Sequence, residues 1–364
     1  EEFGSNSAVD WELGSEDEWK AVEEKADHIS KVDLINNRIV VNPIEPRSAI
    51  SDYNKDNNHF TVYVESQGSH AMRERLAGSL GVEEKNIKVV TNDVGGGFGL
   101  KMMCFPEYVA TMFASRVLQR PVKWTSTRSE AFLSDSHGRD HVTEASIAMD
   151  KEGNFLGVKV DTVAAVGAYL SQYGIFIPTL AGAGMHVGVY KIPVLYNKVN
   201  VVYTNTVPVD AYRGAGRPEA SYVIERLVDK AADDLGIDPV ELRVKNFVQP
   251  DEIGKHEGAI LPLDSCDFKK TTEMSMVNSS YDDFIKRKEE SKLENKLRGI
   301  GISYYIERTQ GEGAENSRVV ISGEGSVKVF AGTQATGQGH ETAWTQILVE
   351  KLGVNPEDVS IHFG

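Results

Sequence analysis

One succession of apolar and polar positions occurs twice in this chain, over residues 59–90 and again over residues 326–363. In each copy apolar residues alternate with polar ones, recur at helical spacing up to a Leu-Gly-Val triplet, and then alternate again, which predicts strand, helix and strand. The pairs Gln67-Gly68 and Gln338-Gly339 stand where the first strand turns into the helix. Backbone N–H groups at such a turn are unpaired and attract anions. The repeat therefore predicts two similar substructures that face one shared site for an anionic cofactor.

The segments between the two copies predict both helices and strands. Residues 106–118 and 218–235 have the apolar spacing of helices, each with an early proline, and the second helix is expected to end at Gly236. Residues 141–149 and 156–165 flank a turn and predict a β-hairpin. The fold class expected is therefore α+β, with mixed sheets and packed helices.

A polar segment divides the chain. Residues 281–296 predict a charge-rich helix without a broad apolar face, which is typical of a solvated connector. Beyond it, Tyr304 and Tyr305 are expected to belong to a strand pair. We therefore expect one domain at residues 1–298 and the truncated start of a second, related half at residues 299–364.

Composition excludes several classes of protein. With 364 residues, of which 40% are apolar, the chain has room for two or more domains with real cores. A net charge of −15 argues against nucleic acid and anionic membrane surfaces as partners. The most apolar stretch, residues 174–194, is broken by proline, histidine and glycines, so no membrane span is expected. Cys104 and Cys266 are far apart, which excludes an iron–sulfur motif and indicates a reducing, cytoplasmic setting.

Three glycine-bearing turns are candidates for the ligand site: residues 95–99, 213–216 and 337–339. Glycine permits positive φ and lets the backbone approach a ligand closely. The usual nucleotide motifs are absent, because Leu100 stands where a dinucleotide fingerprint needs its last glycine and Lys101 lacks the context of a P-loop. Taken singly, each turn is equally well explained as a tight structural turn.

Together the turns carry a resemblance. The segments Val94-Gly-Gly-Gly-Phe-Gly99 with Lys101, Ala211-Tyr-Arg-Gly-Ala-Gly-Arg-Pro-Glu219, Gly337-Gln-Gly-His340 and Asn36-Asn-Arg-Ile-Val-Val-Asn-Pro-Ile-Glu-Pro-Arg47 are similar to motifs of the molybdenum hydroxylases. That family contains xanthine dehydrogenase, aldehyde oxidase and the large subunit of carbon-monoxide dehydrogenase. The resemblance extends over essentially the whole chain and is closest to the copper-free, carbon-monoxide dehydrogenase-like group.

The resemblance implies a molybdopterin, usually a cytosine dinucleotide in bacteria, that holds molybdenum without protein ligands. Gln67 would lie beside the oxygen or sulfur ligands of the metal, and Gly97 and Phe98 would offer backbone amides to the same ligands. Arg213 would lie on the loop beneath the molybdenum. Gln338 would hydrogen-bond the pterin, and His340 is expected to cap its helix or contact an anion rather than bind metal. The cofactor-binding set implied is Gln67, Gly96, Gly97, Phe98, Arg213, Gly214, Gly337, Gln338, Gly339 and His340.

Departures from the family pattern narrow the substrate. Met102 stands where xanthine-type enzymes have a glutamate, and their substrate-binding arginine falls near Ala181, so purine hydroxylation is not expected. Gly214 stands where carbon-monoxide dehydrogenase has a copper-binding cysteine, and Cys104 lies on another loop. The resemblance therefore implies oxidation of an aldehyde, an N-heterocycle or a similar small molecule, with oxygen from water.

The chain is expected to be a fragment of such a large subunit. The glutamate general base of the family falls beyond Gly364, and neither Glu307 nor Glu341 is expected to replace it. Electrons would pass to a [2Fe–2S] small subunit and an FAD-binding medium subunit, in a homo-oligomer of heterotrimers; neither Fe–S clusters nor FAD would lie on this chain. The fragment alone is expected to be inactive and cofactor-free, with mobile or remodelled glycine loops. The alternative is a noncatalytic binding or assembly module that keeps the fold without metal.

Overall fold

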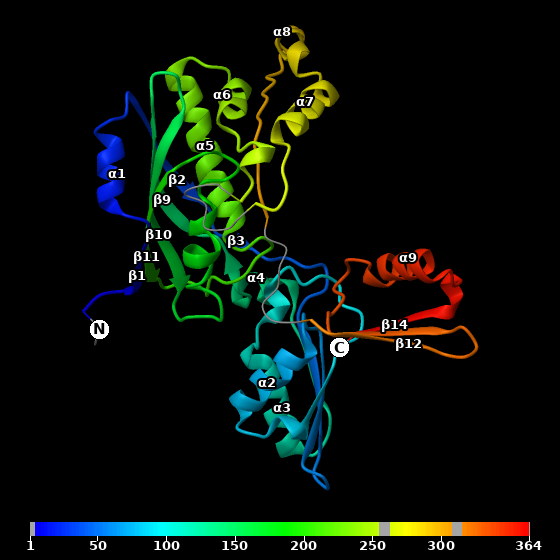
Figure 1. The fold of residues 1–364 in the computed structure, drawn as a ribbon. Coiled ribbons are helices and arrows are strands. Elements are labelled where there is room, and N and C mark those ends of the chain that lie inside the picture. Colours follow the sequence, from blue (N-terminus) through cyan, green and yellow to red (C-terminus); the bar gives the residue numbers. More distant parts are fainter. Residues whose placement is uncertain (1–3, 255–262, 308–314, 364) are drawn as a thin grey trace. The chain divides into compact units, whose positions relative to one another are not determined.

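The computed structural model describes residues 4–254, 263–307 and 315–363, which form two compact units. The first unit holds the described residues of ranges 1–39, 138–210 and 214–308, and the second those of ranges 40–137, 211–213 and 309–364. Each unit is therefore assembled from segments that are distant in the sequence (Figure 1).

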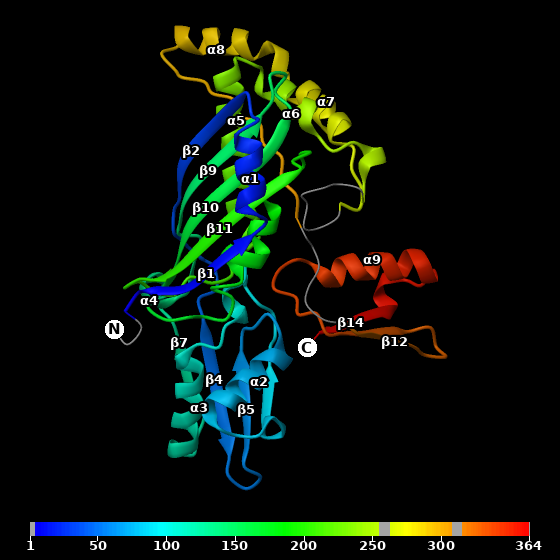
Figure 2. The ribbon, with the colours of Figure 1, turned by 60° about the vertical axis from the view of Figure 1, so that its left-hand side comes forward.

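The first unit is built on a five-stranded sheet with helices on both faces. The strand order is β1 (Ser7–Leu13), β11 (Val194–Tyr203), β10 (Phe155–Gly167), β9 (His141–Met149) and β2 (His28–Asn36), with only β10 and β11 parallel. Helix α5 (Arg217–Leu235) covers one face, where Ile147 and Leu227 share a buried cluster. Helix α1 (Glu16–Glu23) covers the other face, where Trp19 packs on Ala148 (Figure 2). Successive residues of β9 thus serve two cores, as the alternation of a strand requires.

Three further helices complete the first unit. They are α6 (Pro239–Asn246), α7 (Phe268–Ser279) and α8 (Phe284–Leu293). Helix α8 is polar and buries only Ser291, in agreement with the solvated helix that the sequence predicts there. The chain passes from the first unit to the second within β3 (Ile39–Val40) and back within β8 (His137–Gly138), and these two-residue strands pair with each other.

The second unit contains a four-stranded sheet in the order β6 (Ile87–Val90), β5 (His59–Val64), β4 (Ser48–Asn54) and β7 (Val122–Thr125). Helices α2 (Ser69–Leu80) and α3 (Pro106–Leu118) pack together beside this sheet, and α4 (Arg128–Ser134) follows β7 (Figure 2). Their apolar faces meet those of the strands, so that Phe60, Leu76 and Met112 are completely buried.

The second copy of the repeat lies in the same unit. Strands β12 (Ser317–Ile321), β13 (Val327–Ala331) and β14 (Val359–Phe363) form a sheet in that order, and α9 (His340–Leu352) connects β13 to β14. In both copies the two strands that flank the helix pair in parallel, β5 with β6 and β13 with β14. The predicted strand, helix and strand are thus confirmed twice, within a confirmed α+β fold.

One local prediction is wrong. Tyr304 and Tyr305 do not lie in a strand, because the Tyr304 ring packs on Phe247 at 4.8 Å between centroids and its hydroxyl bonds to Thr272. Strand β6 stops at Val90, and residues 91–93 connect it to the glycine loop. No described helix is long and apolar enough to cross a membrane.

Candidate functional site

The loop at residues 94–99 has an unusual backbone. Gly96, Phe98 and Gly99 all have positive φ, at 97°, 56° and 99°. A phenylalanine in this left-handed region is uncommon, because its Cβ crowds the following carbonyl at a cost of roughly 1–2 kcal/mol. The Phe98 side chain is 40% exposed. The loop therefore holds a strained residue at the surface, which is typical of sites where a ligand binds.

Close contacts explain why this loop needs its glycines. A Cβ on Gly97 would lie 2.6 Å from the Gln67 side chain, and one on Gly99 would lie 2.4 Å from the carbonyl oxygen of Ala211. The loop backbone thus passes against Gln67 on one side and against residues 211–213 on another.

Gln67 is hydrogen-bonded to the glycine loop and the residues after it through both its backbone and its side chain. It follows β5 and precedes α2, its backbone N–H donates to the Lys101 carbonyl at 3.1 Å, and its Oε1 accepts from the Gly99 N–H at 2.8 Å. The NH₂ group of the amide is therefore the end that can donate to a ligand. The N–H groups of Gly97 and Phe98 make no hydrogen bond to any residue that the structure describes.

Arg213 lies next to this loop within the second unit. Its backbone N–H donates to the Phe98 carbonyl at 3.0 Å, and its side chain is exposed. Gly214, with φ of 94°, begins the next segment of the first unit. The three residues that the sequence singles out as supporting catalysis, Gln67, Phe98 and Arg213, are thus brought together around one loop.

Behind Gly214 the first unit contains a buried ion pair. Glu219 accepts from the Gly216 N–H at 2.8 Å and pairs with the Arg139 guanidinium at 3.2 Å, with both side chains less than 10% exposed. This contact fixes the first turn of α5 and the glycine turn before it. The sequence alone does not reveal the role of either residue.

The second Gln-Gly turn differs from the first. Gly337 and Gly339 have φ of 108° and 75°, and Gly339 caps α9 without a side-chain contact. The Gln338 side chain folds back to accept from the Thr336 N–H at 2.5 Å, and His340 stacks on Trp344 with centroids 4.9 Å apart. At this turn the glycines leave the first backbone N–H groups of α9 without a side-chain cap, whereas the Gln338 side chain is engaged with Thr336.

A pocket of about 490 Å³ lies in the second unit at this turn. Its lining combines the segment after β6 with the start of α9 and the end of β14: Thr91, Asn92, Asp93, Val94, Gln334, Ala335, Gly337, Gly339, His340, Glu341, Thr342, Ile361, His362 and Phe363. Gln67, Phe98 and Gln338 are not among the lining residues. The pocket is thus lined by the second copy of the repeat and by the four residues that follow the first copy, and no residue of the first copy is among the lining residues.

Two polar atoms in the pocket wall are buried and unpaired within the described part of the chain. They are Oε1 of Gln334, a residue only 7% exposed, and Nδ1 of His340. A buried polar atom without a partner costs roughly 1–3 kcal/mol, so such atoms mark places where a ligand supplies the missing hydrogen bond. Gln334 is not recognisable as a site residue from the sequence, because nothing in its spacing separates it from an ordinary loop residue.

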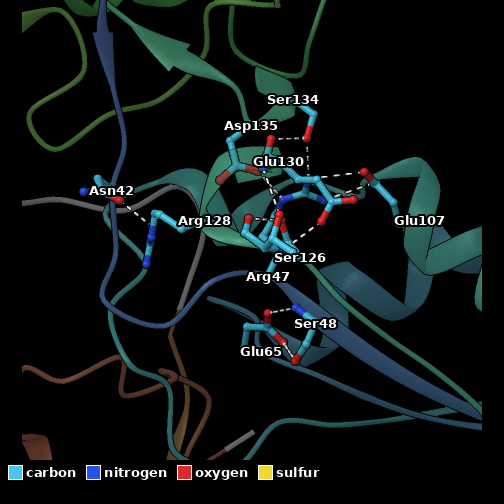
Figure 3. A network of polar contacts seen from close by, with 11 residues as sticks. Asn42, Arg47, Ser48, Glu65, Glu107, Ser126, Arg128, Glu130, Ser134 and Asp135 are labelled. Atoms are coloured by element: carbon cyan, nitrogen blue, oxygen red, sulfur yellow. Dashed lines mark hydrogen bonds and ion pairs between the residues drawn. The ribbon is translucent and has the colours of Figure 1, made fainter. Parts of the chain in front are cut away.

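A network of charged residues braces the segment before β4. The fully buried Arg47 pairs with Asp135 at 2.6 Å and with Glu107 at 3.1 Å (Figure 3). Its guanidinium carbon lies 3.7 Å from the centroid of the Phe105 ring. Burial raises the pKa of Asp135 despite the neighbouring arginine. The sequence places Arg47 in a motif but gives it no role.

Arg128 and Glu65 complete this network. Arg128 donates to the carbonyls of Pro43 and Ile44 at 2.7 and 2.8 Å and to Asn42 (Figure 3). Burial raises the pKa of the Glu65 carboxyl, which accepts from the Ser48 backbone and hydroxyl. These residues hold the segment at 42–48 beside the glycine loop. Among the described residues, no three His, Cys, Asp or Glu side chains gather to hold a metal ion.

Comparison with protein families gives two matches. Residues 1–247 match one family model described as a molybdopterin cofactor-binding domain, and residues 275–364 match a second model with the same description. The matched ranges cover both copies of the repeat and all three glycine turns.

Curated relatives from several bacteria are similar over most of the chain. The 6-hydroxypseudooxynicotine dehydrogenase complex subunit gamma of Paenarthrobacter nicotinovorans is 30% identical, over 93% of this chain and 43% of the relative. The carbon monoxide dehydrogenase large chain of Afipia carboxidovorans is also 30% identical, over 99% of this chain and 47% of the relative. The chain thus spans about half the length of the curated relatives it matches.

Solved structures show the same fold. CO dehydrogenase from Oligotropha carboxidovorans superposes with a TM-score of 0.89 at 28% identity, over 99% of this chain and 47% of that one. Quinoline 2-oxidoreductase from Pseudomonas putida 86 gives a TM-score of 0.90 at 27% identity, with the same coverage of both chains.

Proposed function

Because the chain belongs to the molybdopterin cofactor-binding domains of the molybdenum hydroxylase family, we propose that it forms part of the large subunit of an enzyme that hydroxylates a small molecule. The observation that carries the proposal is the pocket at the second Gln-Gly turn, where the buried Gln334 Oε1 and His340 Nδ1 lack partners among the described residues. A polar, heteroatom-rich ligand such as a pterin would supply them.

The residues present fit this cofactor. Toward the pterin, we assign Gly337, Gln338, Gly339 and His340, whose backbone and ring nitrogens lie at an open helix start. Toward the metal, we assign the amides of Gly96, Gly97 and Phe98, the NH₂ group of Gln67, and the turn at Arg213 and Gly214. When bound, the cofactor would supply the redox chemistry, accepting the electrons removed from a C–H bond.

The chain's own residues would bind the cofactor and orient it. Backbone N–H groups that are held in place stabilise developing negative charge without reorganising, so the strained loop at Phe98 would act as a rigid set of donors. The fastened oxygen of Gln67 fixes the direction in which its NH₂ group points. The turn at Arg213 would contribute to the site from a segment that is distant in the sequence.

For the substrate, we propose an aldehyde, an N-heterocycle or a similar small molecule. Relatives named nicotine 6-hydroxylase large subunit, at 29% identity, and quinoline 2-oxidoreductase support an N-heterocycle. Met102 and Gly214, which depart from the xanthine-type and copper-binding patterns, support neither a purine nor carbon monoxide.

Several finer features belong to the same proposal. These are the cytosine dinucleotide form of the cofactor, the FAD-binding and [2Fe–2S] partner subunits in an oligomer of heterotrimers, the cytoplasmic location, and the boundary near residue 298. That these 364 residues alone hold no cofactor and turn over no substrate also stays a prediction.

The test is to produce the full-length protein with its partner subunits in a host that makes the molybdenum cofactor. We expect stoichiometric molybdenum and release of a cytosine nucleotide on acid hydrolysis, followed by turnover in a screen of aldehydes, N-heterocycles and carbon monoxide. Complete absence of molybdenum and pterin would overturn the proposal and favour a noncatalytic module.

A further inference from the structure

A single carboxylate oxygen accepts hydrogen bonds from both ends of the glycine loop. Oε2 of Glu45 accepts from the Gly95 N–H at 2.7 Å and from Lys101 Nζ at 2.7 Å. The backbone N–H of Glu45 returns a hydrogen bond to the Gly95 carbonyl at 3.2 Å. The strained residues 96–99 thus lie between two points that one side chain holds.

The sequence around Glu45 presets the direction of this side chain. Pro46 follows it, and a residue before proline is restricted to extended backbone conformations. Arg128 donates to the carbonyls of Pro43 and Ile44, and Arg47 is buried in its own ion pairs on the other side. Glu45 therefore extends from a segment that is fixed before and after it.

The contact depends on small size and on charge. A Cβ on Gly95 would lie 2.5 Å from the Glu45 Cβ, so only glycine permits this approach. The Lys101 side chain is fully buried, whereas that of Glu45 is 39% exposed. A buried ammonium requires a partner, and no other ion pair of Lys101 occurs among the described residues.

Hydrogen bonds of the loop residues extend the influence of Glu45 to Gln67. Lys101 accepts from the Gln67 N–H through its carbonyl, and Gly99 donates to Gln67 Oε1 at 2.8 Å. A shift of Lys101 or Gly95 would therefore move Gln67 and the amides of residues 97 and 98 together.

We propose that Glu45 is a positioning residue, which sets the conformation of the glycine loop and, through it, the direction of Gln67 and of the loop amides. Its effect on the cofactor rests on the function proposed above. Its effect on the loop does not, because the contacts exist in the chain by itself.

The experiment compares four forms of the full-length protein, made in a cofactor-competent host: wild type, Glu45→Leu, Glu45→Gln and Glu84→Leu. Glu84 is the matched control, because it pairs with Arg73 at 3.3 Å on the surface of α2 and touches no part of the glycine loop. The readouts are amide hydrogen exchange over residues 95–102 and molybdenum content by mass spectrometry of the metal.

In Glu45→Leu we expect exchange at Gly99, Leu100 and Met102, whose amides do not touch Glu45, to become about tenfold faster. Molybdenum content should fall several-fold. Glu45→Gln keeps an acceptor oxygen and should recover part of both values, and it serves in place of the leucine variant if that protein does not fold. Glu84→Leu should match wild type.

A double variant, Glu45→Leu with Lys101→Met, separates positioning from charge burial. It removes the unpaired ammonium, so the midpoint of thermal unfolding should recover while fast exchange and low molybdenum remain. Recovery of all three, or unchanged exchange in Glu45→Leu, would overturn the proposal. Wild-type protein without molybdenum would instead overturn the proposed function, and the exchange contrast would still decide the role of Glu45.

Discussion

At the scale of single residues, the structure shows roles of side chains that local sequence patterns do not predict. Arg47 is recognisable in the sequence only as the last residue of a proline-flanked motif, yet it is fully buried among two carboxylates and an aromatic ring. Its partners Glu107 and Asp135 come from distant segments, so no spacing rule connects the three. Gln67 and Phe98, by contrast, could be singled out because their neighbouring glycines mark the turn.

Replacing Arg47 tests how much this network stabilises the second unit. Arg47→Met leaves Asp135 buried without a countercharge, and we expect the free energy of unfolding to fall by about 3–5 kcal/mol. Arg73→Met, which breaks only the exposed pair with Glu84, should cost less than about 1 kcal/mol. Urea unfolding curves give both values. Equal costs would mean that the buried network contributes no more than a surface pair.

At the scale of elements, periodicity was a good guide to helices and strands and a poor guide to turn geometry. The helices at Pro106–Leu118 and Arg217–Leu235 and the hairpin of β9 and β10 lie where alternation and helical spacing place them. The two Gln-Gly turns look equivalent in sequence but differ in backbone. Gly68 has φ of 169°, an extended value that any residue adopts, whereas Gly339 has φ of 75°. Backbone angles at a turn depend on its length and neighbours, which the shared dipeptide does not encode.

The two glycines should therefore respond differently to the same substitution. Neither has an atom within 4 Å of the position that a Cβ would occupy, so only backbone strain separates them. Gly339→Ala should lower the free energy of unfolding by about 1–2 kcal/mol, since alanine is unfavourable in the left-handed region. Gly68→Ala should stay within about 0.5 kcal/mol of wild type. Denaturant titrations check both; a larger loss at Gly68 would contradict this account of the first turn.

At the scale of the whole molecule, the chain crosses repeatedly between its two units. Residues 40–137 share a unit with residues 211–213 and 309–364, although much of the first unit lies between them in sequence. The sequence reveals the duplication, because its two copies carry the same pattern, but the pocket is lined by the second copy and by residues 91–94, which follow the first. The sequence does not reveal that residues 211–213 belong to the second unit, because a contact between distant segments leaves no periodic signal.

The stability of the first unit should depend on pH through His186. Burial, with a smaller contribution from nearby His141, lowers the pKa of His186 to about 4 from its ordinary value of 6.5. Between these pH values the unfolded chain binds a proton that the folded unit does not, so stability rises with pH across this window and is lost as pH falls. The slope from this residue approaches 1.4 kcal/mol per pH unit.

His186→Gln should remove this part of the slope. Between about pH 4 and pH 6.5, the slope of the unfolding free energy against pH should be smaller in the variant by the equivalent of nearly one proton. Above about pH 7 the two proteins should respond to pH alike, which serves as the internal control. Urea titrations at stepped pH measure the slopes. Parallel curves throughout would show that the pKa of His186 is the same in the folded and the unfolded state.

The hydrogen bond between the Phe98 carbonyl and the Arg213 N–H has a consequence for synthesis. A ribosome adds residues in order, so the glycine loop emerges long before the segment that supports it from Arg213, and the second repeat emerges later still. During translation the loop therefore lacks this support while residues 100–212, including one segment of the first unit, are made. Slow elongation over residues 138–210 would prolong this exposure, and a nascent chain stalled there should be more readily cleaved at Phe98 than the finished protein.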